Sequence, residues 1–301
     1  MFDKIDKHEL SNDVDFVIAG VPFEATSTSP RAGTKSAPFA IRKAFNLFSL
    51  LTELGIDIFQ KKIVDIGDIE VYPSLIEETM KAIENTISLI LQSRSENPPI
   101  PIIIGGDHFI TYPIIRCLSN SLNQKFGIII FDAHVDLYDK WLYKEQHAHC
   151  TVSHRILDLK SIVPDDLLYV GTRDVDYEET ENLAKFSINP ISAHLLSETN
   201  PESILLEQLK SFQERNIENV YVSIDIDVLD PSYAPGTGYP IPGGLNYRQL
   251  WNILKLIPQK FKVIGFDMVE VCPPYDSSEM TSITAARLIM EFIGFIVKNM
   301  K

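Results

Sequence analysis

The chain has 301 residues, 45% of them hydrophobic, and a formal net charge of −14. This length allows one large domain or two and is ample for a buried core. The negative charge argues against binding of nucleic acid or an anionic membrane through net electrostatics, and it suits a small cationic substrate. Three widely spaced cysteines form no disulfide framework.

The first residues, "MFDKIDKHELSNDVDF", lack the charged start and apolar core of a signal peptide. The sequence also lacks an apolar run of about 20 residues, the length needed to span a membrane. We therefore expect a soluble, cytoplasmic protein.

Short apolar runs alternate with longer amphipathic stretches along the chain. The short runs are rich in Val and Ile and nearly continuous, which is typical of parallel strands covered on both faces. The longer stretches have helical spacing of apolar residues. In chain order, these patterns predict a strand over 15–23, a helix over 37–54, a strand over 62–68, a helix over 74–93, strands over 100–106, 126–134 and 167–173, a helix over 203–215, a strand over 219–227, a helix over 246–257, a strand over 262–271 and a helix over 281–299. The alternation predicts a single α/β domain, 1–301, with a largely parallel sheet and helices on both sides.

Unusual polar residues follow three of the predicted strands. They lie in "GGDHFIT" (105–111), in "DAHVD" (132–136) and in "SIDIDVLDP" (223–231). In open α/β sheets, ligands bind in the crevice beyond the carboxyl ends of the strands. In an extended chain, alternate residues share a face, so Asp225 and Asp227 would point the same way. Two buried carboxylates without a partner are costly, so something positive is expected between them.

Taken singly, these residues have ordinary explanations, such as a helix cap for Asp107 and a turn for Asp230. Taken together, they supply four carboxylates and two imidazoles, and no Lys or Arg lies nearby in the sequence. Six ligands suit two ions with bridging carboxylates, and oxygen-rich ligation favours manganese or another hard divalent ion over zinc. Two such ions typically share and activate a water. The predicted metal ligands are His108, Asp132, His134, Asp136, Asp225 and Asp227.

The motifs "GGDHFIT", "FDAHVD" and "SIDIDVLDPSYAPGTGYPIPGG", in this order, resemble those of the ureohydrolases: arginase, agmatinase and their relatives. The resemblance extends from residue 31 to residue 289. It implies a three-layer α/β/α sandwich with a mostly parallel sheet and two manganese(II) ions per chain. It also implies a homo-oligomer, as a trimer or hexamer, and hydrolysis of a guanidinium group to urea and an amine.

The resemblance also implies roles for individual residues. Asp132 and Asp225 would bridge the two ions. Glu270, in "FDMVEV", would pair with the substrate guanidinium, and His149, in "QHAHCT", would be the catalytic histidine. Asp136 would carry a proton from the attacking water, with His149 relaying protons to solvent. The remaining ligands would serve one ion each, in two pairs: His108 with Asp136, and His134 with Asp227.

The substrate is harder to predict. Residues 137–150 lack the Thr/Ser/Asn segment by which arginases hold the amino-acid end, which favours agmatine and its conversion to putrescine and urea, a step in polyamine biosynthesis. The segment "GTRDVDY" (171–177) is closer to arginase, but Asp176 could hold the distal ammonium of agmatine, and Thr237 is also assigned to the substrate. If Lys140 and Lys144 faced the pocket, they would suit guanidinobutyrate. Arginine, aminopropylagmatine and formiminoglutamate stay open as alternatives.

Rival classes of protein remain. Cys150 stands where the family usually has a glycine, so Cys150 with His149 or His154 could form a nucleophilic pair that works through a thioimidate. That mechanism leaves the six metal-type residues unexplained. Deacetylase-like amidohydrolases share the fold but hold a single zinc, so a count of bound metal separates them from ureohydrolases. A metal-binding protein without catalysis is the third alternative.

Overall fold

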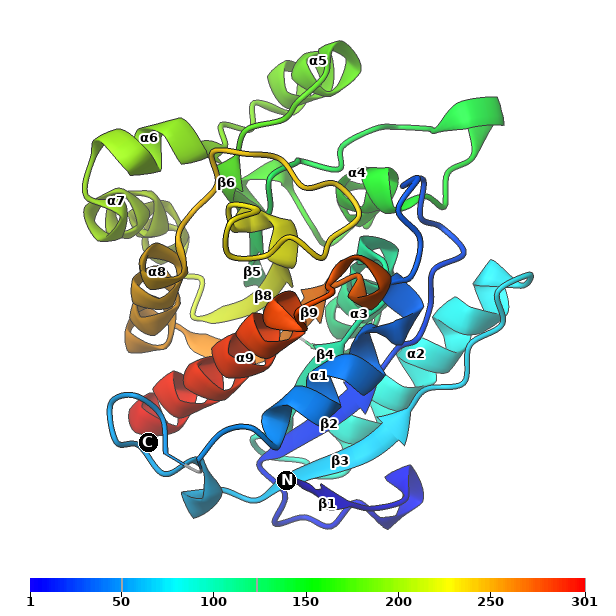
Figure 1. Cartoon of the computed structure of the whole chain (residues 1–301), viewed down its shortest axis with the longest axis vertical. Coiled ribbons are helices and arrows are strands. Elements are labelled where there is room, and N and C mark those ends of the chain that lie inside the picture. The colour runs from blue at the N-terminus through cyan, green and yellow to red at the C-terminus, as the bar shows by residue number, and fades with distance from the viewer. Residues whose placement is uncertain (50, 123, 301) are drawn as a thin grey trace.

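The computed structural model describes residues 1–49, 51–122 and 124–300 (Figure 1). Across these residues, the strands form a nine-stranded sheet in the order β1-β3-β2-β4-β9-β8-β5-β6-β7, and every pairing of neighbouring strands is parallel. The strands are β1 (Asp3–Lys4), β2 (Phe16–Gly20), β3 (Ile63–Asp68), β4 (Ile100–Ile104), β5 (Phe126–Phe131), β6 (Leu167–Thr172), β7 (Ile191–Ser192), β8 (Asn219–Asp225) and β9 (Lys262–Val269). All carboxyl ends therefore lie at one edge of the sheet.

Helices cover both faces of the sheet (Figure 1). They are α1 (Ala37–Phe45), α2 (Ile76–Gln92), α3 (Thr111–Ser121), α4 (Val152–Leu157), α5 (Tyr177–Phe186), α6 (Ala193–Glu198), α7 (Pro201–Glu214), α8 (Tyr247–Lys260) and α9 (Met280–Asn299). Helices α1, α7, α8 and α9 share one buried cluster with the sheet, and α2, α3 and α4 share the other. Alternate strand residues face opposite clusters, as Ile102 and Ile103 do on β4. This architecture confirms the predicted three-layer α/β/α sandwich.

Helix α9 is long and apolar enough to cross a membrane by length and composition alone. However, 78% of its most apolar 18-residue window is buried inside the protein, against the sheet and its neighbours α1 and α8. The apolar character of α9 is thus that of a core helix.

The predicted elements differ from the observed ones mainly at their ends. The strands predicted over 126–134 and 219–227 end early, at Phe131 and Asp225, because the polar residues that follow leave the sheet. The helix predicted over 37–54 ends at Phe45; its apolar pattern continues into a loop, where Leu47 is exposed, and it includes residue 50, which lies outside the described residues. The sequence patterns did not predict β1, β7, α3, α4, α5 or α6.

One glycine determines how β4 leads into the motif "GGDHFIT". Gly106 donates its N–H to Val21 O at 2.9 Å, and Asp107 donates to Phe23 O at 2.9 Å. A Cβ at Gly106 would lie 1.7 Å from Phe23 O. Only glycine therefore allows this close approach of two backbones. The approach fixes the position from which His108 enters the edge of the sheet.

We expect Gly106→Ala to destabilise the fold by roughly 1–3 kcal/mol or more, because the added methyl collides with backbone that cannot move aside. Gly105→Ala is the control, since its Cβ would mainly meet side-chain tips, Ile110 Cδ1 and Val269 Cγ1. Chemical denaturation of both variants measures the difference. Equal losses of stability in the two variants would show that the collision with Phe23 does not explain the effect of Gly106→Ala.

Candidate metal centre and active site

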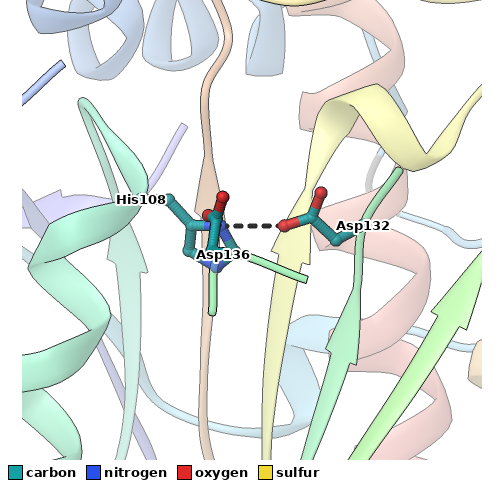
Figure 2. Close-up of side chains that lie close together, drawn as sticks. All are labelled: His108, Asp132 and Asp136. Atoms are coloured by element: carbon teal, nitrogen blue, oxygen red, sulfur yellow. Dashed lines mark ion pairs between the residues drawn. The ribbon is translucent and has the colours of Figure 1, made fainter. Parts of the chain in front are cut away.

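Two groups of histidine and aspartate side chains meet at the carboxyl edge of the sheet. In the first group, His108 Nδ1 lies 3.0 Å from Asp132 Oδ2 and 3.1 Å from Asp136 Oδ2. Figure 2 shows these three side chains close together. In the second, His134 Nδ1 lies 3.1 Å from Asp227 Oδ2 and 3.3 Å from Asp132 Oδ1. Asp132 belongs to both groups, one carboxylate oxygen facing each.

Turns, and not extended strands, bring these side chains together. Strand β8 ends at Asp225, which caps the short 3-10 turn Ile226–Val228 by accepting the Asp227 N–H at 2.8 Å. The expectation that Asp225 and Asp227 share one face of a strand is therefore wrong. "DAHVD" is not extended either, because Asp136 has a φ of 49°, in the left-handed region. Asp225 Oδ2 still comes within 3.5 Å of His108 Nδ1.

The cluster concentrates negative charge away from solvent. Burial raises the pKa of Asp225 well above its usual range, and the charges of Asp227 and Asp132 raise it further. Burial also raises the pKa of Asp136, with the charge of Asp132 as the second cause. Burial disfavours the charged form of His108, yet Asp132 and Asp136 raise its pKa well above the usual range. All three pKa shifts indicate that the cluster attracts positive charge.

The residues present fit divalent metal ions. His108 Nδ1 and Asp132 Oδ2 are buried and lie 3.0 Å apart, but neither atom makes a hydrogen bond of acceptable geometry. Among the described residues, no Lys or Arg forms an ion pair with Asp132, Asp136, Asp225 or Asp227. Unpaired buried carboxylates with imidazoles at their side are the donor set of a hard cation site.

Glu270 and His149 form a buried pair beside the metal-type groups. Strand β9 ends at Val269, and Glu270 has a φ of 61°, which turns it out of the strand. Glu270 Oε1 accepts the backbone N–H of His108 at 2.8 Å and lies 3.0 Å from His149 Nδ1. Burial opposes the charge on His149, but the Glu270 carboxylate outweighs it and raises the pKa of His149 to about 9. His149 is therefore protonated at neutral pH.

Two residues that the sequence did not single out hold the other side of His149. Thr28 Oγ1 lies 2.8 Å from His149 Nε2. The ring of Tyr239 stacks on the His149 ring with centroids 5.9 Å apart, and its hydroxyl donates to Thr28 O at 3.0 Å. Thr28 comes from the loop after β2, so its sequence position gave no signal of this contact.

A pocket opens outward from these groups. It is lined by Thr28, His134, Asp136, Tyr138, Trp141, His149, Cys150, Asp174, Asp176, Glu179, Asp225, Asp227, Tyr239 and Glu270. Asp176 is thus at the pocket, but its carboxylate also caps α5, accepting the Glu178 N–H at 2.8 Å. The same carboxylate contacts the Tyr138 hydroxyl. Glu179 is buried and accepts the Leu137 N–H at 3.0 Å, and burial raises its pKa to about 7.

Three other predicted candidates lie outside the pocket lining. Thr237 is buried with a relative exposure of 1%, and Tyr239, two residues later in the same loop, reaches the pocket in its place. Lys140 and Lys144 are exposed and do not line the pocket. The loop over 230–244 has no regular period, so the residue that turns inward could not be predicted from spacing.

The surroundings of Cys150 do not favour a nucleophile. Its side chain lines the pocket, but burial, followed by the charges of Asp136 and Glu179, raises the pKa of the thiol far above neutrality. The reactive form of cysteine is the thiolate. His154 packs its ring against Phe186 and is not part of the lining. The thioimidate alternative therefore loses its support.

Comparison with known proteins decides the family. A family model described as Arginase family matches residues 14–294. The chain belongs to the arginase family. It is 35% identical over 288 residues to agmatinase of Blochmanniella floridana, covering 94% of this chain and 89% of the relative. It is 32% identical over 291 residues to formimidoylglutamase of Halalkalibacterium halodurans, covering 94% and 88%. The structure of agmatine ureohydrolase from Thermoplasma volcanium aligns with a TM-score of 0.82 at 29% identity, covering 99% and 95%. This arginase-family protein is thus a ureohydrolase, and its relatives differ in substrate.

Asp132→Ala should abolish tight binding of both metal ions, because the two oxygens of Asp132 face the two groups separately. His108→Ala should mainly weaken one site. Glu178→Ala, which removes an exposed carboxylate on α5 outside the pocket lining, is the control and should retain both ions. Metal analysis after gel filtration measures the ratio of manganese to protein. Two tightly held ions in Asp132→Ala would contradict the shared role of Asp132.

Proposed function

We propose that this ureohydrolase hydrolyses agmatine to putrescine and urea, with two manganese(II) ions as cofactors. One observation carries the choice of substrate. Among the described residues, the pocket lining contains acidic, aromatic and histidine side chains but neither Lys nor Arg. A substrate that carries positive charge at both ends matches such a lining. Agmatine has a guanidinium at one end and an ammonium at the other.

The proposed arrangement of agmatine follows from the two ends of the pocket. Its guanidinium would lie between the metal centre and Glu270. Its ammonium would lie near Asp174, Asp176 and Glu179, where the rings of Tyr138 and Trp141 add a favourable surface for a cation. The aliphatic chain would join the two.

Other substrates fit this lining less well. Arginine, guanidinobutyrate and formiminoglutamate each carry a carboxylate at the distal end, which would face acidic side chains with no cation beside them. The named relative with formimidoylglutamase activity keeps that alternative open at the level of the family. Aminopropylagmatine also ends in cations, so only measurement separates it from agmatine.

The metal ions would be held by Asp132 between the two groups, with Asp225 as a second bridge. His108 and Asp136 would complete one site, and His134 with Asp227 the other. When bound, two divalent ions activate water for attack at neutral pH.

The remaining chemistry belongs to the side chains. Glu270 Oε1 is held by the His108 N–H and by His149, so the other carboxylate oxygen can orient the guanidinium through a charge-assisted hydrogen bond. Asp136 takes a proton from the attacking water. The leaving amine must be protonated to depart, and the His149 imidazolium supplies that proton. The proton that Asp136 took from the water then returns to His149 through solvent, so both side chains regain their starting states. Urea and the protonated amine are the products.

The assignment of 1–301 to one ureohydrolase domain is supported by a single sheet with strands from Asp3 to Val269 and by the family match over 14–294. Assembly as a trimer or hexamer and a cytoplasmic location stay predictions from the resemblance and the sequence.

A panel of substrates tests the function directly. Purified protein with manganese should release urea from agmatine with a higher kcat/KM than from arginine, guanidinobutyrate or aminopropylagmatine, and should release little formamide from formiminoglutamate. Protein stripped of metal by a chelator is the control. A preference for formiminoglutamate, or one bound zinc in place of two manganese ions, would contradict the proposal.

Glu270→Gln should lower kcat/KM for agmatine by roughly tenfold to a hundredfold, because a charge-assisted hydrogen bond is worth about 1.5–3 kcal/mol. Both metal ions should be retained. Glu178→Gln, an exposed change on α5 outside the pocket lining, is the matched control. Steady-state kinetics and metal analysis of the two variants measure the difference, and loss of metal in Glu270→Gln would make Glu270 a ligand.

The pH dependence of kcat is an independent test of the pair formed by Glu270 and His149. A proton donor must be protonated, so wild-type kcat should fall as pH rises through the pKa of His149, which the Glu270 carboxylate raises. In Glu270→Gln the carboxylate that raises this pKa is gone, so the alkaline limb should move to lower pH. An alkaline limb at the same pH in both proteins would mean that another group controls it.

A further inference from the structure

Asp267 is a buried acid that the proposed chemistry does not use. It lies on β9 with a relative exposure of 0%. Its carboxylate accepts three hydroxyl protons: from Thr111 Oγ1 at 2.8 Å and Tyr221 OH at 2.7 Å on Oδ2, and from Ser223 Oγ at 2.6 Å on Oδ1. Ser223 and Asp267 are register partners on neighbouring strands. Such a satisfied buried network has a defined direction for each proton.

The direction of these protons determines the tautomer of His108. Ser223 has one hydroxyl proton and gives it to Asp267. The Ser223 oxygen also lies 3.0 Å from His108 Nε2, so in that contact it can only accept. Thr111 Oγ1 lies 3.3 Å from Ser223 Oγ but already donates its own proton to Asp267, so it does not compete. His108 Nε2 must therefore carry a hydrogen.

A histidine with hydrogen on Nε2 presents the lone pair of Nδ1 to a metal. Nδ1 of His108 is the ring atom that faces Asp132 and Asp136, and it makes no hydrogen bond of acceptable geometry. We propose that Ser223 and Asp267 are positioning residues, which hold His108 in the tautomer and orientation that let Nδ1 bind metal. This inference rests on the metal centre proposed above, but not on the choice of substrate.

A purely structural role is the competing explanation. Asp267 joins β9 to β8 and to the start of α3, and that alone would make it important for folding. Tyr221 provides the comparison, because its hydroxyl donates to the same carboxylate at nearly the same distance as Ser223. Both hydroxyls are buried, and only that of Ser223 contacts His108.

The test compares Ser223→Ala with Tyr221→Phe. Each change removes one buried hydroxyl that donates to Asp267, so similar shifts in thermal unfolding are expected. Full-length protein freed of metal by a chelator is then titrated calorimetrically with manganese chloride. Ser223→Ala should bind one of the two ions about 10–100-fold more weakly than wild type, the usual effect of losing a partner of a metal-bound histidine. Tyr221→Phe should stay within a few-fold of wild type.

A second variant covers the case in which Ser223→Ala does not fold. Ser223→Cys keeps a group at this position that can donate and accept, although sulfur is larger than oxygen and bonds more weakly, so its manganese affinity should fall between those of wild type and Ser223→Ala, and below that of Tyr221→Phe. Wild-type affinity in the Ser223 variants would overturn the inference. An equal loss in Tyr221→Phe would do so as well, because it would make the role structural.

The outcome is separable from that of the proposed function. If the wild-type protein takes up two manganese ions but releases urea from no guanidino compound, the proposed function fails and the inference is still tested. If the wild-type protein takes up no manganese, the inference is overturned too, because His108 then has no ion to face.

Discussion

The site depends on one electrostatic constraint: four carboxylates are held together, away from water, and none of them forms an ion pair with a Lys or Arg of the described residues. Burying such charges is costly unless a cation compensates them. Backbone N–H groups satisfy part of the demand, since Asp227 accepts the Ala133 N–H and Asp225 accepts the Asp227 N–H. Two imidazoles cannot balance four negative charges. The charge of this cluster therefore suits dications, whichever substrate the protein binds.

The same constraint explains the position of Glu270. A guanidinium that approaches two dications is repelled, so the site needs a negative group that faces the substrate and not the ions. The backbone turn at Glu270 directs its carboxylate there, and the His108 N–H holds it. His108 thus joins the two halves of the site: its ring faces the proposed metal and its backbone N–H binds the carboxylate that would receive the guanidinium.

The sequence predicted the fold and the ligand set for different reasons. Apolar runs predicted the strands. The unusual polar residues that follow these runs predicted which edge of the sheet carries the metal ligands. The predicted local geometry was wrong. It assumed that the alternation of strand residues continues past Asp225 and through "DAHVD", whereas the chain turns in both places. The predicted groups still converge, since turns at one edge of a parallel sheet lie close together. Thr28, Tyr239 and Asp267 could not be predicted this way: the first two act from irregular loops, and the third sits in a strand read only for its apolar pattern.

Overall similarity does not decide the substrate, because agmatinase and formimidoylglutamase relatives are 35% and 32% identical over similar lengths. Within a shared fold, function depends on the site. The proposed metal ligands come from the carboxyl ends of strands and the turns that follow them, whose positions the sheet determines. The outer part of the pocket, its mouth, comes from other segments. Tyr138 and Trp141 lie in an irregular loop, and Asp176 and Glu179 lie at the start of α5. These segments can change charge without disturbing the sheet. A carboxylate-bearing substrate needs a cation at the mouth, and the lining described here offers acids instead. The metal centre would thus determine the reaction, and the charge at the mouth of the pocket would determine which substrate reacts.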